Sequence, residues 1–286
     1  MFQLSPVGMA IVDGETGDFL EVNDAVLSST GYTKKEFIQL SYWDITPKKY
    51  EEQELQQIKD LENKGHFGPN QKEYVRKDGT KYPISISGVA LTNTDGRKIV
   101  LGIIEDISAR KAYEEKLKHF ALYDPLTDLP NRRLLSENMQ QSIAQCKREK
   151  KLLAILLLDV NKFKPVNDEF GHSTGDKLLT KIAQRIKRSV QRKTDTVARI
   201  GGDEFVIMLP LIKEAQHAIQ IANKICQSIE KPFIIDSNTI SISASIGISI
   251  FPEHGHDENS LLANADLAMY QIKDESKINS KIFEVE

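Results

Sequence analysis

The amino-acid sequence predicts two α/β domains joined by a helix, and three observations lead to this prediction. The chain has 286 residues, of which 40% are hydrophobic and 28% charged, and this suits two soluble domains better than a single core. Its first third consists of short strand-like runs with tight turns, whereas longer helical and strand-like patterns alternate after residue 124. Between these parts, residues 108–124 are charged and contain neither glycine nor proline, as expected of a connecting helix.

Residues 1–107 predict an antiparallel sheet with helices. The runs "GMAIVD" and "DFLEV" flank the turn-rich "GETG", and Asp78-Gly79 joins two further strands in a hairpin. Asp95-Gly96 marks another turn before the strand "RKIVLGIIEDI". Helical patches occupy the middle of this region, from residue 23 to residue 64. We expect one small domain over residues 1–107.

Residues 108–123 are expected to form the connecting helix. Ile107, Tyr113, Leu117 and Phe120 recur at helical intervals in an otherwise charged segment. The apolar stripe is narrow, and a narrow stripe favours a coiled coil of two helices over a broad contact with a core.

Residues 124–286 predict a second domain with a mostly antiparallel sheet. "LLAILLL" is fully apolar, which is typical of a central strand covered on both faces. "TISISASIGISI" alternates apolar and small polar residues, which indicates a half-buried strand. Helical patterns cover residues 131–150, 175–193, 214–230 and 259–277, and a short final strand follows. The fold class is therefore α/β, in an α+β arrangement of sheet and flanking helices.

Three carboxylates in this second domain suggest chemistry. Asp203 and Glu204 stand side by side at the tip of the hairpin "ARIGGDEFVIML", where two glycines permit positive φ. Asp159 ends the apolar strand, where a carboxylate is costly unless something compensates it. If the hairpin lies beside that strand, the carboxylates form an oxygen-rich pocket of the kind that magnesium prefers. Spacing alone leaves the alternative equally open, in which Asp159 starts a loop and Asp203 is solvated.

Four separated motifs give this domain a family resemblance. "RIGGDEF" follows "DVNKFKPVNDEFGHSTGD", with "DPLTDLPNRR" before and "NADLAMYQIK" after, and the set closely resembles the GGDEF diguanylate cyclases. The resemblance implies a palm-like nucleotidyl-cyclase sheet flanked by helices. It also implies an enzyme that joins two GTP molecules into cyclic di-GMP and releases two pyrophosphates, with each subunit of a homodimer holding one GTP. The implied cofactor is Mg²⁺, two ions per active site, with Mn²⁺ as an alternative.

The resemblance further implies roles for individual residues. Metal binding would fall to Asp159, Asp203, Glu204 and the carbonyl of Val160, and either hairpin carboxylate would act as the base for the attacking hydroxyl. The other implied substrate contacts are Asn167 and Asp176 to guanine, His172 near the ribose, the backbone amides of Phe163 and Lys164 to the phosphates, and Lys273 and Lys277 to the terminal phosphates.

Taken singly, several of these residues have ordinary structural explanations. Asn167 suits a turn, Asp176 suits a helix N-cap, and a histidine such as His172 in a glycine-rich loop is usually structural. The last helix also departs from the family pattern, because "KDESK" carries Lys277 in place of arginine and lacks the usual glycine. Lysine keeps the charge but loses the bidentate fork, so we expect weaker GTP binding but not a dead enzyme.

The first domain resembles a PAS sensor domain through "SPVGMAIVD", "VNDAVLSSTGY", "RKDGTKYPISIS" and "GIIEDISARK". A blue-light flavin site needs a reactive cysteine, and residues 1–107 contain none. A haem site needs an axial ligand, and His66 in the polar stretch "NKGHFGPN" is the one histidine present there. The ligand of this domain is therefore left unknown, and a scaffold used for dimerisation alone remains an alternative.

A further motif suggests regulation. "QRKTD" holds Arg192 and Asp195 at the position of the family's Arg-x-x-Asp inhibitory site, just before the hairpin in sequence. Arginine can bind a phosphate or a guanine edge bidentately, and the carboxylate can accept guanine donors. The resemblance implies cyclic di-GMP as the inhibitor.

The composition of the chain limits the classes of partner and the cellular location that we expect. A formal net charge of -3 gives no reason to expect nucleic-acid binding. No apolar run approaches the roughly 18 residues of a membrane helix, and Cys146 and Cys226 suggest neither a disulfide framework nor a zinc site. We expect a cytoplasmic protein, although a membrane segment outside this chain stays possible.

Two other functions stay open at this point. One is a non-catalytic receptor that binds GTP or cyclic di-GMP and signals through protein partners. Against it stand an intact Gly-Gly-Asp-Glu-Phe and an intact Asp159. The other is a longer protein that carries a phosphodiesterase domain as well.

Overall fold

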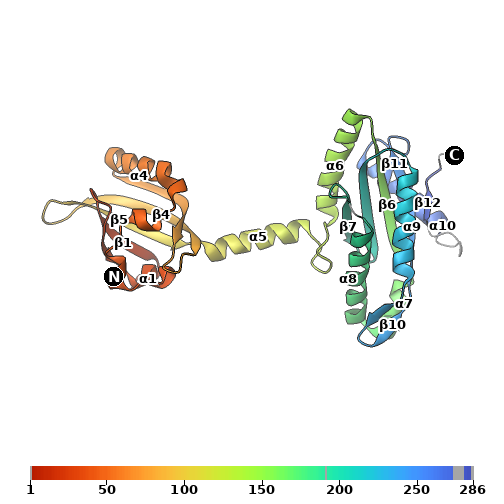
Figure 1. The fold of residues 1–286 in the computed structure, drawn as a ribbon, viewed down its shortest axis with the longest axis horizontal. Helices are drawn as coiled ribbons and strands as arrows, with labels where there is room; N and C mark the ends of the chain where they lie inside the picture. Colours follow the sequence, from red (N-terminus) through yellow and green to blue (C-terminus); the bar gives the residue numbers. More distant parts are fainter. Residues whose placement is uncertain (1, 191, 273–279, 285–286) are drawn as a thin grey trace. The chain divides into compact units, whose positions relative to one another are not determined.

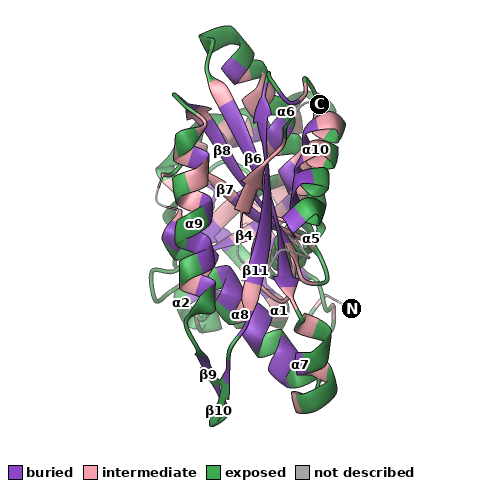
Figure 2. Cartoon of the chain, turned by 90° about the vertical axis from the view of Figure 1, so that its right-hand side faces the viewer, coloured by how far each residue is buried: buried purple, intermediate pink, exposed green. Residues whose placement is uncertain are grey.

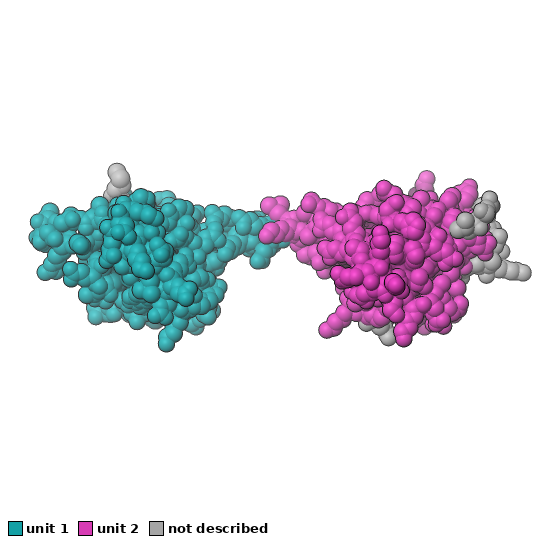
Figure 3. Space-filling model, turned by 90° about the horizontal axis from the view of Figure 1, so that it is seen from above, with its two compact units in different colours: residues 1–116 teal, residues 117–286 magenta. Residues whose placement is uncertain are grey.

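The computed structural model describes residues 2–190, 192–272 and 280–284, and the chain divides into two compact units, residues 1–116 and 117–286 (Figure 3). Each unit has its own five-stranded sheet with flanking helices (Figure 1). Among the described residues, no helix combines the length and the apolar character needed to cross a membrane. The predicted α/β class, with an antiparallel sheet in the first unit, is confirmed.

The first unit has a fully antiparallel sheet in the order β2-β1-β5-β4-β3. Its strands are β1 (Gly8–Asp13), β2 (Phe19–Val22), β3 (His66–Val75), β4 (Lys81–Thr92) and β5 (Lys98–Asp106). The helical middle comprises α1 (Asp24–Thr30), α2 (Lys34–Phe37), α3 (Tyr42–Ile45), a 3-10 turn (Lys48–Tyr50) and α4 (Glu51–Lys64). These helices cover one face of the sheet, where Phe37, Tyr74 and Ile84 are buried in a common core.

The connecting helix α5 (Ser108–Leu122) starts directly from this core. Ile107 is 1% exposed, and its amide donates to the carbonyl of Pro83 at 3.0 Å. Ile107 therefore belongs to the core of the first unit, and the prediction that it forms part of the stripe on the connecting helix is wrong. The rest of the stripe is open, because Tyr113, Leu117 and Phe120 are 67%, 67% and 61% exposed.

The second unit is built on the sheet β12-β11-β6-β8-β7, with β6 in the centre. Its strands are β6 (Leu152–Asn161), β7 (Thr196–Gly201), β8 (Glu204–Ile212), β11 (Ser243–Phe251) and β12 (Ser280–Ile282), and a small hairpin joins β9 (Phe233–Ile235) to β10 (Asn238–Ile240). Its helices are α6 (Arg132–Glu149), α7 (Phe163–Phe170), α8 (His172–Ser189), α9 (Gln216–Glu230) and α10 (Glu258–Ile272). All pairings are antiparallel except that of β11 with β12.

Helices cover both faces of this sheet, so its central strands are almost wholly buried (Figure 2). One face packs on α8 and α9 in a large aliphatic cluster, and the other packs on α6 and α10. The fully apolar run before Asp159 is thus a central strand, as predicted.

Strand β11 is buried on both faces, whereas its alternating sequence predicted a half-buried strand. Its small residues are there to admit α10. A Cβ on Gly247 would lie 1.9 Å from the carbonyl oxygen of Ala265, and the hydroxyl of Ser249 donates to the carbonyl of Leu261 at 2.7 Å. Small residues in a strand can therefore mark close helix packing as well as solvent exposure.

Candidate active site

The register between β6 and β8 places Asp159 directly opposite Glu204. On the other side of β6, Ser245 of β11 is the partner of Asp159 in the same row. Side chains opposite each other in antiparallel strands lie on one face of the sheet, here the face covered by α6 and α10. Asp159 is 8% exposed and Glu204 is half-buried, so one end of this face carries two carboxylates in a largely apolar setting.

A tight turn holds the third carboxylate. Gly202 and Asp203 form the turn between β7 and β8, and Gly201 pairs with Glu204. Gly202 has a φ of 48°, in the region that glycine adopts without steric cost. The chain therefore presents Asp203 at the tip and returns at once into β8 with Glu204.

The neighbouring carboxylates make Glu204 harder to ionise. The pKa of Glu204 is raised, first by burial and then by the negative charges of Asp159, Asp203 and Asp266, while Arg132 opposes the shift. Asp266 lies on α10 and Arg132 begins α6, so the helices that cover this face also shape its potential. A cation at this end of the sheet would relieve the repulsion.

The oxygen atoms at this end of the sheet suit magnesium, but the three predicted carboxylates are not grouped closely enough to bind one ion together. Within the described ranges, no three His, Cys, Asp or Glu side chains are grouped closely enough to hold a metal ion together. Asp159 and Glu204 are the pair that the register brings face to face, and Val160, which follows Asp159, would add a backbone carbonyl. Magnesium takes oxygen ligands and usually keeps several waters, so two carboxylates and a carbonyl suit it chemically.

The chain turns from β6 into α7 at Lys162, three residues after Asp159. Lys162 has a φ of 59° and is the N-cap of α7, but its side chain makes no capping hydrogen bond. The amides of Phe163 and Lys164 thus stand in the first turn of a helix without a side-chain cap. Helix N-termini of this kind bind phosphates through their N–H groups and dipole.

Helices α7 and α8 bring Asn167 next to the segment that carries Asp176. The side-chain oxygen of Asn167 is buried and has no hydrogen-bond partner among the described residues. Gly175 faces it so closely that a Cβ there would lie 1.9 Å from this oxygen. Asp176 follows Gly175 and is exposed, as is His172 at the start of α8. A buried, unpartnered amide oxygen beside an exposed carboxylate is suited to a ligand that donates hydrogen bonds.

Lys273 and Lys277 lie outside the described residues, so their predicted contacts with the terminal phosphates stay predictions.

Arg192 and Asp195 bind each other in the loop between α8 and β7. The guanidinium of Arg192 donates to both oxygens of Asp195, at 2.5 and 3.1 Å, and to the carbonyl of Pro210 at 3.1 Å. The side chain of Asp195 is 3% exposed and that of Arg192 35%. Because Pro210 lies six residues along β8 from Glu204, this pair is about 20 Å from the hairpin tip. The motif is near the tip in sequence but at the other end of the hairpin in space.

Sequence reasoning assigned no role to Arg199, which supports the hairpin tip. Its guanidinium donates to both carboxylate oxygens of Asp124 at 2.9 and 3.0 Å, and twice to the carbonyl of Gly202 at 3.0 and 2.7 Å. Thr127 donates its amide and its hydroxyl to the same Asp124. The Asp-x-x-Thr spacing in "DPLT" is the sequence signal for this turn.

The pKa of Asp124 reflects these contacts. Burial alone raises it, but the hydrogen bonds from Thr127 and Arg199 outweigh burial, and the pKa falls below 3.8. The ion pair is largely withdrawn from water, with side chains 11% and 17% exposed.

We expect Arg199→Met to destabilise the second unit by about 2–3 kcal/mol, because it leaves Asp124 without its cation and Gly202 without its donor. Urea unfolding at neutral pH measures this, and hydrogen exchange of the hairpin amides should accelerate. Since the folded-state pKa of Asp124 is depressed, the stabilisation is present above about pH 4 and is lost as pH falls through that depressed value. The control Lys177→Met breaks an exposed pair with Asp236 and should cost less than about 1 kcal/mol. Equal losses in both variants would contradict the role of Arg199.

Comparison with known proteins identifies both units. The model described as "Diguanylate cyclase, GGDEF domain" matches residues 121–279, and a PAS domain model matches residues 6–109. The chain is 43% identical over 169 residues to MucR of Pseudomonas aeruginosa, named a bifunctional diguanylate cyclase/cyclic di-GMP phosphodiesterase, covering 59% of this chain and 24% of MucR. It is 36% identical over 188 residues to the diguanylate cyclase TpbB of the same species, covering 65% of this chain and 43% of TpbB.

A solved structure agrees with these matches. The crystal structure of the GGDEF domain of TpbB superposes with a TM-score of 0.54 at 36% identity, covering 56% of this chain and 99% of that domain. The chain spans less than half the length of the two curated relatives, at 24% and 43%. The GGDEF model alone accounts for more than half of this chain. The chain, with a PAS domain before its GGDEF domain, therefore belongs to the GGDEF family of diguanylate cyclases.

Proposed function

We propose that the chain condenses two GTP molecules into cyclic di-GMP and two pyrophosphates, under the control of its PAS domain. The observation that carries this proposal is the placement of Asp159 opposite Glu204, with the uncapped N-terminus of α7 starting four residues after Asp159. This placement supports the proposal, because carboxylates that suit a cation and amides that suit a phosphate lie at one end of the sheet. Family membership and an unaltered Gly-Gly-Asp-Glu-Phe support the same conclusion.

Asp159, the carbonyl of Val160 and one or both hairpin carboxylates would hold Mg²⁺ or Mn²⁺. When bound, the metal supplies charge neutralisation of the triphosphate and lowers the pKa of the attacking 3'-hydroxyl. The amides of Phe163 and Lys164 would bind phosphate oxygens. Asp203 or Glu204 would accept the proton of the hydroxyl.

Each subunit would supply half of the reaction site. Each chain would bind one GTP. The 3'-hydroxyl of each GTP has to face the α-phosphate of the other, and a two-fold dimer provides this arrangement. The exposed stripe of Tyr113, Leu117 and Phe120 on α5 is the candidate seam between two chains. We also infer that the protein works in the cytoplasm, where GTP is available.

Product chromatography after incubation with GTP and magnesium tests the activity, and Asp203→Asn should reduce product formation by about a thousandfold or more. Asp203 is at a surface turn, so the variant should keep the wild-type unfolding midpoint. Glu253→Gln, an exposed carboxylate change elsewhere in the unit, serves as control. A dimeric wild-type protein that binds GTP and magnesium yet forms no product would replace this proposal with the non-catalytic receptor.

Guanine selectivity should depend on the space that Gly175 leaves for Asn167. The wild type should use ATP about a thousandfold or more less well than GTP, because adenine lacks the donors that Asn167 and Asp176 would accept. Gly175→Ala displaces the Asn167 oxygen and should raise the KM for GTP by about tenfold or more, whereas Ser173→Ala on the exposed side of α8 should leave it unchanged. Comparable turnover of both nucleotides would overturn the assignment of guanine contacts.

The role of α5 as a dimer seam is tested by Leu117→Glu. Leu117 is 67% exposed in one chain, so the change should leave the fold intact while placing two like charges across a paired seam. We expect the dimer dissociation constant, measured by analytical ultracentrifugation, to rise about tenfold or more, with activity falling at fixed protein concentration. Lys118→Glu controls for charge alone. An unchanged oligomeric state and activity would mean that α5 is a linker only.

Product feedback through Arg192 and Asp195 is a further part of the proposal. Cyclic di-GMP should inhibit non-competitively with GTP, because the pair is remote from the hairpin tip, and Arg192→Lys should raise the inhibition constant about tenfold by losing the bidentate fork. Lysine is chosen because it keeps a cation beside the buried Asp195, whereas Arg192→Ala would leave that carboxylate without one. Arg188→Lys, an exposed arginine on α8, is the matched control. Competitive inhibition that is the same in all three proteins would place the inhibitor in the active site instead.

A further inference from the structure

A neutral polar cluster lies beside Asp159, at the end of the sheet that carries the candidate active site. It consists of Asn161, the last residue of β6, and of Ser243 and Ser245 on β11. The register pairs Ser243 with Asn161 and Ser245 with Asp159. Because residues two apart in a strand lie on the same face, all four side chains share the face that α6 and α10 cover. The cluster therefore continues the carboxylate end of this face with groups that carry no charge.

The amide of Asn161 joins the two hydroxyl groups. Its nitrogen donates to the hydroxyl oxygen of Ser243 at 3.1 Å, and its oxygen accepts from the hydroxyl of Ser245 at 3.0 Å. The hydroxyl of Ser245 has one proton, and this contact uses it. The lone pairs of Ser245 are therefore the part of the hydroxyl that stays available beside Asp159, its partner across the two strands.

Burial makes this available acceptor unusual. Ser245 is 3% exposed, so bulk water has little access to its oxygen. Among the described residues, no hydrogen bond is donated to this oxygen. Buried polar groups are normally satisfied by the protein, by ordered water or by a bound group. The oxygen of Ser245 is thus suited to a donor that arrives with a ligand.

A cation at Asp159 would bring such donors. Asp159 and Glu204 face each other, and within the described ranges no third His, Cys, Asp or Glu is grouped with them closely enough to complete a metal site. Octahedral Mg²⁺ held by few carboxylates keeps several waters. The protons of those waters need acceptors, and contacts of this outer kind orient the ligands and tune the affinity of metal sites.

We propose that Ser245 is a positioning residue for the hydration shell of the cation, accepting a hydrogen bond from a water that the cation holds beside Asp159. Asn161 acts through Ser245, because it takes the hydroxyl proton and leaves the lone pairs free for this water. Ser243 acts through Asn161, because it accepts from the amide nitrogen and so keeps the amide oxygen toward Ser245. The inference rests on the proposed function, since it needs a cation at Asp159.

Ser249 shows what a purely structural hydroxyl does in the same strand. It lies four residues further along β11 on the same face, is 0% exposed and donates to the carbonyl of Leu261 at 2.7 Å. Its proton therefore fastens α10 to the sheet, whereas the proton of Ser245 stays within the sheet, on the side chain of Asn161. The two serines are a matched pair for separating metal binding from stability.

Binding of Mn²⁺ in the presence of 3'-deoxy-GTP tests the inference without turnover, because this nucleotide lacks the attacking hydroxyl. Electron paramagnetic resonance of the free ion gives the affinity of the full chain for Mn²⁺. Ser245→Ala should weaken Mn²⁺ binding about tenfold. Ser249→Ala should leave the metal affinity unchanged and lower the thermal unfolding midpoint.

Two outcomes would overturn the inference, and they differ in what they mean for the proposed function. If wild type and Ser245→Ala bind Mn²⁺ equally well, Ser245 has no role toward the cation, and the proposed function is unaffected. If the wild-type protein binds 3'-deoxy-GTP but no Mn²⁺, the proposed function fails together with the inference.

Two substitutions of the half-buried Asn161 have opposite expected effects and do not depend on how Ser245→Ala folds. Asn161→Asp still accepts the proton of Ser245 and adds a negative charge to the face, so Mn²⁺ affinity should rise about threefold or more. Asn161→Leu releases that proton toward Asp159, so the affinity should fall about threefold or more.

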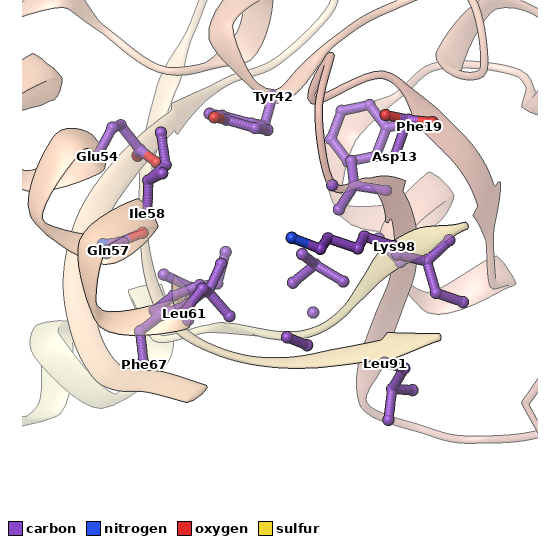
Figure 4. Close-up of a pocket in the computed structure, with 18 of the residues that line it drawn as sticks. Asp13, Phe19, Tyr42, Glu54, Gln57, Ile58, Leu61, Phe67, Leu91 and Lys98 are labelled. Carbon is purple, nitrogen blue, oxygen red and sulfur yellow. The ribbon is translucent and has the colours of Figure 1, made fainter. Parts of the chain in front are cut away.

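Gln57→Leu is the matched control for the change from amide to leucine. Gln57 lies on α4 and lines a cavity of about 570 Å³ in the first unit (Figure 4), so this variant should bind Mn²⁺ like the wild type. Affinities that fall in both Asn161 variants, or in neither, would contradict the assignment.

Discussion

The antiparallel register between β6 and β8 is the constraint on which the candidate site depends. A shift of one residue would turn Asp159 or Glu204 toward the other face of the sheet, since side chains alternate along a strand. The buried aliphatic rows on both faces fix this register, because a slip would place many apolar groups wrongly at once. The stability of the sheet therefore holds Asp159 and Glu204 opposite each other, although their two carboxylates repel.

The remaining parts of the site are arranged around that fixed row. The chain leaves β6 into the first turn of α7, and α8 packs back on α7, so the uncapped amides of Phe163 and Lys164 and the buried oxygen of Asn167 follow from a single connection. On the other side, Arg199 holds the carbonyl of Gly202 and the carboxylate of Asp124 together. The hairpin tip is thereby tied to the segment that directly follows α5, within one unit of the chain.

The sequence predicted the elements with strong patterns and missed those set by tertiary contacts. The apolar run before Asp159 and the glycines before Asp203 identified the central strand and the hairpin, because burial and positive φ constrain residue types directly. The predicted half-buried strand was wrong, since Gly247 is small in order to admit α10. Arg199 went unnoticed because its carboxylate partner Asp124 is 75 residues away in the sequence. Motif resemblance supplied the substrate roles, which spacing alone left open.

Ile107 has a consequence for how the sensor can signal. This residue is held in the sensor core by its buried side chain and by the hydrogen bond from its amide to the carbonyl of Pro83, and Asp106 accepts from the amide of Ser108 at 2.8 Å. No slack loop separates the last strand from the helix that follows it. A flexible loop would absorb small motions of the strand, whereas a helix that follows the strand directly would tilt or twist with it. The start of α5 is therefore fixed to the last strand of the sensor sheet by direct hydrogen bonds.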